Sequence, residues 1–179
     1  MLRKKILNKK FIVGVIGLGY VGLPRSIQFC EKKIKVIGFD NDEKKINQLS
    51  IGKSYLTNIS NKKISRNVHS KYFKPSSNFS EIKNVDVVII CVPTPLKHNL
   101  EPDLKYIINT IDIIKKYLKK NQIICLESTS YPGTTNEEII EKIRKKFDIG
   151  KNFFVGYSPE RNDPGLKSIK ISNIPKLVS

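Results

Sequence analysis

The sequence predicts a doubly wound α/β fold built on a parallel sheet, and three observations support this class. Short runs rich in β-branched residues alternate with segments of helical periodicity five times along the 179 residues. The run at 11–16 is continuously apolar, as expected of a strand that is buried on both faces, and the runs at 34–39 and 85–92 are largely apolar. A glycine-rich turn follows the first run, at the point where a strand should pass into a helix.

The same patterns predict the elements in order. Apolar residues recur at helical spacing after residue 103, and Thr134 or Thr135 is the expected cap of the last helix. Residues 51–79 form a polar, lysine-rich insertion in which only a short helix at 62–72 is expected. In chain order the expected elements are strand 11–16, a helix after Gly22, strand 34–39, helix 41–49, strand 85–92, helix 103–120, strand 122–127, a helix to Phe147 and strand 153–157.

Each glycine of the turn at 17–22 has its own role in binding a dinucleotide. Gly17 permits the tight turn, Gly19 lets the backbone approach a pyrophosphate, and Gly22 lets the following helix pack closely on the strand. The free N–H groups at the start of that helix favour a phosphate. The spacing differs from that of a nucleotide triphosphatase P-loop, so the turn predicts a Rossmann-type dinucleotide site.

Asp40 closes the second strand, where a carboxylate can accept hydrogen bonds from an adenosine ribose. A carboxylate there repels a 2′-phosphate, so the sequence favours NAD over NADP. Lys44 and Lys45 weaken this preference without reversing it. An alternative role for Asp40 is to cap the helix that follows, and the two roles are compatible.

The remaining predicted site residues also lie at the carboxyl ends of strands, which is where ligands bind in open α/β sheets. They are found at 92–96, at 128–129 and at Glu160. Together with the glycine turn and Asp40 they should converge on one crevice. A hydroxyl and a carboxylate at these strand ends would lie near a nicotinamide ring.

The net charge of +17 and the sequence pI near 9.8 are typical of a protein that binds nucleic acid or an anionic membrane. The lysines are nevertheless scattered over the polar segments without an RNA-type aromatic motif, so we expect a solvated basic surface and no nucleic-acid partner. No apolar run approaches the ~18 residues of a membrane-spanning helix, and the first residues do not resemble a signal peptide. The prediction is a cytoplasmic protein without a membrane partner.

Three cysteines, Cys30, Cys91 and Cys125, lie in apolar segments and lack Cys-x-x-Cys spacing. We interpret them as small core residues, and the sequence predicts no metal site.

Four motifs in order resemble the nucleotide-sugar 6-dehydrogenases of the UDP-glucose/GDP-mannose dehydrogenase family. The versions after the fourth and fifth predicted strands look most like the branch that oxidises UDP-N-acetylglucosamine. The resemblance covers nearly the whole chain, which it identifies as one NAD-binding domain over 1–179. The motifs are GLGYVGLP at 17–24, VPTP at 92–95, ESTSYPGTT at 127–135 and SPERNDPG at 158–165.

The resemblance also implies roles for individual residues. Thr129 would help to order a catalytic water, and Glu160 would act in acid/base chemistry or in positioning. Arg161 and Asn162, together with Glu160, would meet a UDP-sugar substrate. The residues implied to contact NAD are Gly17, Gly19, Tyr20, Val21, Gly22, Asp40, Lys45, Thr94 and Thr129.

Members of this family oxidise the sugar C6 alcohol twice and use a cysteine and a lysine for the second oxidation. Both residues belong to a part of the family that this sequence does not contain, and residues 160–179 resemble the start of the link to it. None of the three cysteines fits the nucleophile. The resemblance therefore implies a truncated or split enzyme, with a separate chain as the possible source of the cysteine, or a non-catalytic NAD-binding module. The oligomeric state is not implied.

Arg25 departs from the resemblance, because the family usually has an apolar residue at this position. It shares a helical face with Val21 and Phe29, where an unpaired guanidinium would be costly to bury. We expect either that its side chain reaches outward to water or that the helix packs less well.

Overall fold

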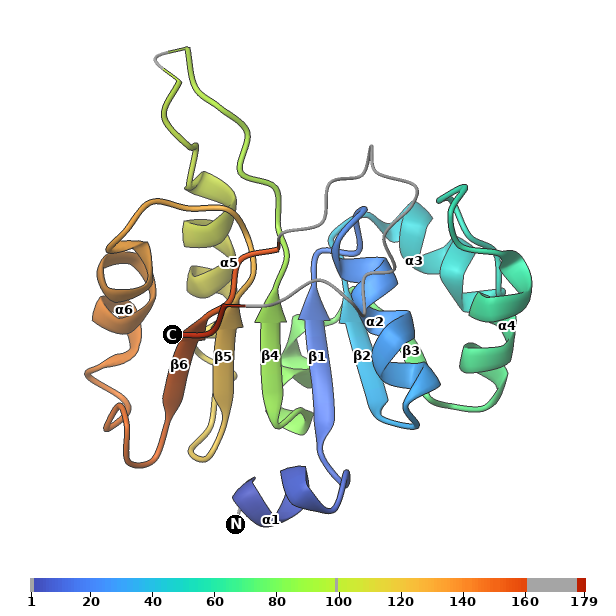
Figure 1. Cartoon of the computed structure of the whole chain (residues 1–179), viewed down its shortest axis with the longest axis horizontal. Coiled ribbons are helices and arrows are strands. Elements are labelled where there is room, and N and C mark those ends of the chain that lie inside the picture. Colours follow the sequence, from blue (N-terminus) through green and yellow to red (C-terminus); the bar gives the residue numbers. More distant parts are fainter. Residues whose placement is uncertain (1, 99, 161–176) are drawn as a thin grey trace.

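The protein is described by a computed structural model that covers residues 2–98, 100–160 and 177–179. The described residues form one parallel sheet of six strands in the order β3-β2-β1-β4-β5-β6, with helices on both faces (Figure 1). The strands are β1 Ile12–Ile16, β2 Lys35–Phe39, β3 Phe73–Ser76, β4 Val87–Ile90, β5 Ile123–Leu126 and β6 Phe154–Tyr157.

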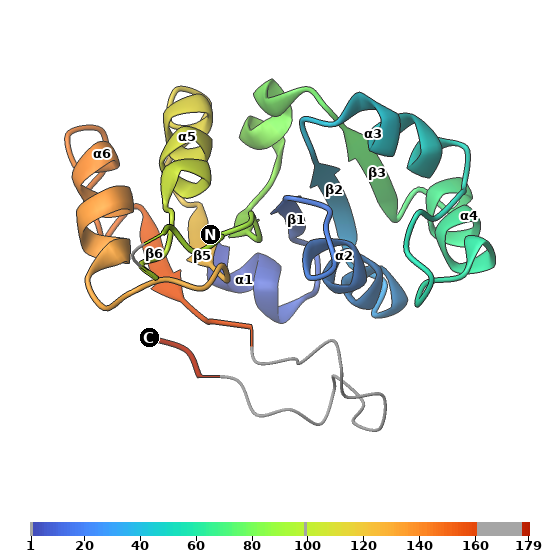
Figure 2. The same cartoon turned by 90° about the horizontal axis from the view of Figure 1, so that it is seen from above.

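The helical segments divide between two hydrophobic cores, one on each face of the sheet. Residues of α2, α3 and α4 pack on one face, and residues of α5, η2 and α6 pack on the other, where η1 adds Ile82. Seen from above, α5 and α6 lie on the opposite side of the sheet from α2 (Figure 2). The helical segments are α1 Leu2–Leu7, α2 Gly22–Glu31, α3 Glu43–Ser50, α4 Asn61–His69, η1 Phe79–Asn84, α5 Lys105–Ile114, η2 Thr135–Ile140 and α6 Glu141–Ile143.

The doubly wound parallel sheet that the sequence predicts is confirmed. Strand β1 pairs in parallel with β2 on one side and with β4 on the other, so the strand order reverses between β1 and β4. Such a reversal opens a crevice at the carboxyl ends of the two strands, because the following connections leave toward opposite faces. The topology therefore places a ligand site beside the glycine turn.

The polar segment at 51–79 contains more structure than its sequence predicts. The short helix expected there is α4, and a sixth strand, β3, follows it and pairs with β2. Its sequence, Phe-Lys-Pro-Ser, gives a weak strand signal, because Pro75 interrupts the pattern. A proline is compatible with an edge strand, which has no neighbour on one side.

Two helices differ from the expected boundaries. The helix expected at 103–120 is regular only over Lys105–Ile114, and the one expected to reach Phe147 begins as a π-helix, η2, before the short α6. Thr134 occupies the N-cap position of η2, but its side chain does not cap the helix. Its hydroxyl instead donates to the carbonyl oxygen of Tyr131 at 2.8 Å. No helix among the described residues is long and apolar enough to cross a membrane.

The last described residues return to the sheet beside β6. The backbone N–H of Tyr157 donates to the carbonyl oxygen of Ser179 at 2.8 Å, and the N–H of Ser179 donates back to Tyr157 at 3.0 Å. The hydroxyl of Ser158 also donates to the carbonyl oxygen of Leu177. Residues 177–179 therefore lie along the outer side of β6.

Candidate dinucleotide site

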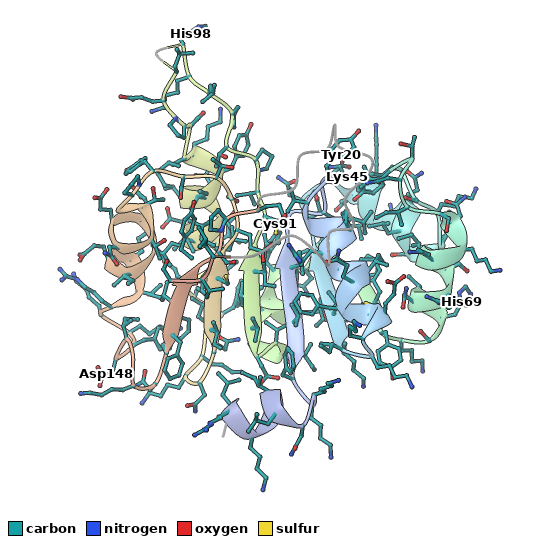
Figure 3. All side chains as sticks on the ribbon, in the orientation of Figure 1. Tyr20, Lys45, His69, Cys91, His98 and Asp148 are labelled. Atoms are coloured by element: carbon teal, nitrogen blue, oxygen red, sulfur yellow. The ribbon has the colours of Figure 1, made fainter. Side chains whose placement is uncertain are left out.

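A crevice of about 620 Å³ lies at the carboxyl ends of the central strands, as the topology requires. Tyr20, Lys45 and Cys91 mark its position at the upper end of the sheet in Figure 3. Most residues that the sequence assigned to the site line this crevice; Gly22 does not. The predicted residues that line it are Gly17, Gly19, Tyr20, Val21, Asp40, Lys45, Thr94, Thr129 and Glu160.

The three glycines of the turn differ in what surrounds them. Gly17 has φ +87°, and a Cβ there would lie 2.7 Å from the carbonyl oxygen of Cys91. A Cβ on Gly22 would lie 1.8 Å from the carbonyl oxygen of Gly17, so α2 packs against the turn at backbone contact. A Cβ on Gly19 would meet no protein atom within 4 Å, although Gly19 lines the crevice.

The open space at Gly19 matches what a pyrophosphate requires. A ligand can approach the backbone closely there, at the start of α2, where N–H groups and the helix dipole favour negative charge. Of the three glycines, Gly17 and Gly22 are therefore required by the fold, whereas Gly19 leaves room for a ligand. The arrangement fits a dinucleotide.

Asp40 holds the turn in place while its carboxylate faces the crevice. It accepts hydrogen bonds from the N–H of Leu18 at 2.9 Å and of Asp42 at 3.0 Å, and Lys45 Nζ lies 3.7 Å away. A carboxylate has about four lone-pair sites, so acceptor capacity remains for a ribose. Asp42, rather than Asp40, caps α3 by accepting from the N–H of Lys44 at 2.9 Å. The alternative role of Asp40 as the helix cap was wrong.

Tyr55, from the polar segment before α4, contacts the glycine turn through its hydroxyl group. Its hydroxyl donates to the carbonyl oxygen of Leu18, and Lys45 lies over its ring at 5.8 Å. Burial raises the pKa of Tyr55 above its ordinary value, and the nearby carboxylates of Asp40 and Asp42 raise it further. The hydroxyl therefore keeps its proton and remains a donor. Nothing in the sequence around Tyr55 indicated this contact.

Hydroxyl groups organise the loops after β4 and β5. Ser128 is buried, and its hydroxyl donates to the carbonyl oxygen of Val92 at 2.7 Å, which ties the two loops together. Thr94 and Thr129, on either side of this contact, line the crevice. The structure thus brings together the two threonines that the sequence placed at separate strand ends.

Arg25 takes neither of the two arrangements expected from the sequence. Its side chain is largely buried and paired: Nε lies 3.2 Å from Glu127 Oε2, and Nη2 contacts Glu160 Oε2. Its Nη1 also donates to Gln28 Oε1 at 3.0 Å. The expectation that it reaches outward or loosens α2 was wrong, because two carboxylates from distant strand ends neutralise it. The ion-pair partner of Glu160 is therefore Arg25 of α2.

Glu127 is a further acidic residue of the crevice that had no assigned role. It is buried at the end of β5, lines the crevice and accepts from Cys91 Sγ at 3.8 Å. The sequence signal that could have found it is the unusual charge of Arg25, which requires a nearby carboxylate once the helix is packed. Arg161 and Asn162 lie outside the described residues.

The cysteines are buried or partly buried, as expected of core residues. Cys30 and Cys91 are buried, although Cys91 also lines the crevice, and Cys125 is partly buried. No group of His, Cys, Asp and Glu side chains in the described part of the chain could hold a metal ion.

Burial raises the pKa of the Cys30 thiol from 9.0 to about 12, so we expect this thiol to be unreactive in the folded protein. Labelling with iodoacetamide at pH 8 followed by peptide mass spectrometry should leave Cys30 unmodified until urea is added. Because folding raises its pKa, its contribution to stability is present at neutral pH and is lost as the pH rises above about 9. Rapid labelling without denaturant would contradict the buried position.

Comparison with known proteins identifies the family of the chain. A family model described as the NAD-binding domain of the UDP-glucose/GDP-mannose dehydrogenase family matches residues 11–178. Protein CapL of Staphylococcus aureus is 39% identical over 93% of this chain, and the UDP-N-acetyl-D-glucosamine 6-dehydrogenase of Salmonella typhi is 35% identical over 93%. This chain spans 39% of the length of each of these relatives.

Solved structures give the same assignment. An NDP-N-acetyl-D-galactosaminuronic acid dehydrogenase from Methanosarcina mazei has a TM-score of 0.79 at 29% identity, over 90% of this chain and 37% of that one. A GDP-mannose dehydrogenase from Pseudomonas aeruginosa has a TM-score of 0.78 at 28% identity, over 83% and 36%. The chain therefore belongs to the UDP-glucose/GDP-mannose dehydrogenase family, and the part it matches is the family's NAD-binding domain.

Proposed function

We propose that this chain is the NAD-binding portion of a nucleotide-sugar 6-dehydrogenase that oxidises the C6 alcohol of UDP-N-acetylglucosamine or a related UDP-sugar to the uronic acid. NAD is the cofactor of the matched domain. The observation that carries the proposal is the convergence of the glycine turn, Asp40, the two threonines and Glu160 on one crevice. The similarity to UDP-N-acetyl-D-glucosamine and UDP-N-acetyl-D-mannosamine dehydrogenases supports a UDP-sugar as the substrate class.

We assign the two ends of the crevice to the two halves of the cofactor. Gly19 and the start of α2 would hold the pyrophosphate, and Asp40 would accept hydrogen bonds from the adenosine ribose. The nicotinamide would then lie toward Thr94 and Thr129, beyond β4 and β5. When bound there, NAD supplies a hydride acceptor.

The residues at the nicotinamide end have the chemistry for proton handling. We assign Thr129, which is exposed in the crevice, to hold a water by its hydroxyl, and Glu160 to act as acid/base or positioning group. Arg25 holds Glu160 in place through its guanidinium. Arg161 and Asn162 remain assigned to the sugar nucleotide, next to Glu160 in the sequence.

The chain spans 39% of the length of its curated relatives. We therefore assign the complete reaction to these residues together with the remaining part of the family's enzymes, which either follows in the same polypeptide or comes from a separate one. The 179 residues alone should bind NADH and should not produce NADH from UDP-N-acetylglucosamine. The remaining part of the family can then be supplied as a second chain. If NADH still binds but no turnover follows, the second candidate, a non-catalytic NAD-binding module, is favoured. The ion pair between Glu160 and Arg25 is compatible with this candidate.

A titration with NADH, followed by its fluorescence, tests the cofactor assignment. Wild-type protein should bind saturably, and Asp40→Asn should lower the affinity about tenfold to a hundredfold, since hydrogen bonds to a charged group contribute about 1.5–3 kcal/mol. Asparagine keeps an oxygen for the N–H of Leu18, so the turn should stay folded. The variant should also lose discrimination against NADPH, because the carboxylate no longer repels the 2′-phosphate.

The matched control is Glu43→Gln, which removes one negative charge from an exposed position nearby and should leave NADH affinity unchanged. If wild-type protein shows no saturable binding, the assignment of the crevice to NAD fails. If both variants bind like the wild type, Asp40 is not the ribose ligand.

A further inference from the structure

The edge of the sheet opposite the crevice carries most of the net positive charge of the described residues. All six strands are parallel, so the segments that precede them meet at one edge. We call this edge, together with α1, the amino-end face. Figure 1 places α1 there, at the other end of the strands from the crevice. The amino-end face consists of residues 2–11, 31–35, 70–72, 83–86, 119–122 and 148–153.

Charge on this face is strongly one-sided. It holds thirteen lysines and arginines, all exposed, against three carboxylates, whereas the rest of the described residues hold sixteen against twelve. A biased amino-acid composition would act on every surface alike, so it does not account for this separation. The even scatter of lysines expected from the sequence is therefore not what the fold produces.

Few of these cations are neutralised within the protein. In the described part of the chain, only Lys5 and Lys151 of this set form ion pairs, with Asp86 and Asp148. The remaining cations project from several segments at once, which concentrates positive potential along the edge. A surface of this kind attracts a polyanion or an anionic surface.

The exposed apolar side chains of α1 distinguish between these partners. Leu7 is 73% exposed and Ile6 is 37% exposed, and both lie between Arg3, Lys4 and Lys5 on one side and Lys9 and Lys10 on the other. Aliphatic side chains flanked by lysines gain by entering the headgroup region of a bilayer while the ammonium groups contact lipid phosphates. They gain nothing comparable on a nucleic-acid backbone.

We propose that the amino-end face docks on the surface of an anionic lipid bilayer, with α1 lying against the headgroups. Docked in this way, the crevice faces away from the bilayer and stays open to the cofactor and to a soluble sugar nucleotide. The proposal concerns peripheral binding only, and it does not depend on the proposed function.

Sedimentation with phosphatidylcholine vesicles, with and without phosphatidylglycerol, tests this proposal. The protein should bind only the vesicles that contain phosphatidylglycerol, and added salt should release it. The triple variant Lys4→Glu, Lys10→Glu, Lys83→Glu should lower the partition coefficient more than tenfold, because each lysine near an anionic surface contributes a factor of about five. None of these three lysines forms an ion pair in the described residues.

The control triple variant Lys53→Glu, Lys62→Glu, Lys97→Glu changes the net charge equally but lies outside the amino-end face, and it should bind far more tightly than the first triple variant. Leu7→Ser changes no charge and should weaken vesicle binding severalfold. An equal loss in both triple variants would overturn the proposal. The proposal would also be overturned if Leu7→Ser bound vesicles like the wild type and duplex DNA released the protein from them. That result would identify the amino-end face as a nucleic-acid surface. An unchanged circular dichroism spectrum and urea midpoint show that each variant is folded.

Discussion

Replacing Arg25 with leucine should lower the free energy of unfolding by about 3–5 kcal/mol, the cost of removing one member of a buried ion pair. Glu127 and Glu160 come from the ends of β5 and β6, and the guanidinium holds both against α2. Leucine fills the position with an apolar side chain but removes the cation that contacts both carboxylates. Urea denaturation followed by circular dichroism measures the effect.

Two further variants separate charge pairing from simple loss of packing. Arg25→Lys keeps the charge but loses the planar guanidinium that reaches both carboxylates, so its loss of stability should be intermediate. Adding Glu160→Gln to Arg25→Leu removes one of the two carboxylates that Arg25 contacted and should recover part of the loss. A double variant less stable than Arg25→Leu alone would contradict the charge explanation.

Alanine at Gly22 should destabilise the protein, whereas alanine at Gly19 should damage only cofactor binding. At Gly22 the new Cβ would lie 1.8 Å from the carbonyl oxygen of Gly17, so α2 must move away from the turn. Overpacking of this kind costs about 1–3 kcal/mol, and occasionally more. At Gly19 the Cβ meets no protein atom within 4 Å, so stability should be unchanged or rise by about 0.4–1 kcal/mol as the unfolded chain loses freedom.

The same Cβ at Gly19 would occupy the space that a pyrophosphate needs beside the backbone. We therefore expect Gly19→Ala to lower NADH affinity at least tenfold, while its urea midpoint stays at or above that of the wild type. Paired urea and NADH titrations of the two variants measure both properties. Wild-type NADH affinity in Gly19→Ala would show that the pyrophosphate does not approach this glycine.

The parts of the fold that the sequence predicts are those with local causes. The glycine turn needs only a strand, three glycines and a helix within a few residues, and Asp40 follows the next strand at the required distance. The strand β3 escaped prediction because Pro75 and Lys74 give an edge strand little apolar pattern. A single sequence shows a strand that is buried on both faces as a run of apolar residues, whereas an edge strand held mainly by backbone pairing leaves no such run.

The contacts that the sequence does not predict join residues far apart in the chain. Arg25 is separated from Glu127 by 102 positions and from Glu160 by 135, so no spacing rule connects them. Tyr55 reaches Leu18 from a segment that had no expected role. The uneven charge of the amino-end face has the same origin, because it exists only once six separate segments are brought to one edge of the sheet.

The chain returning along β6 has a consequence for how the protein behaves at high concentration. An open sheet offers unpaired N–H and C=O groups at both outer strands, and a second molecule can add to either row. Here Ser179 occupies backbone groups of Tyr157 on one side, and on the other Pro75 lacks the N–H that a growing sheet needs. Each margin of the sheet is thereby a less complete template for a further strand, one at Tyr157 by pairing and the other at Pro75 by a missing donor.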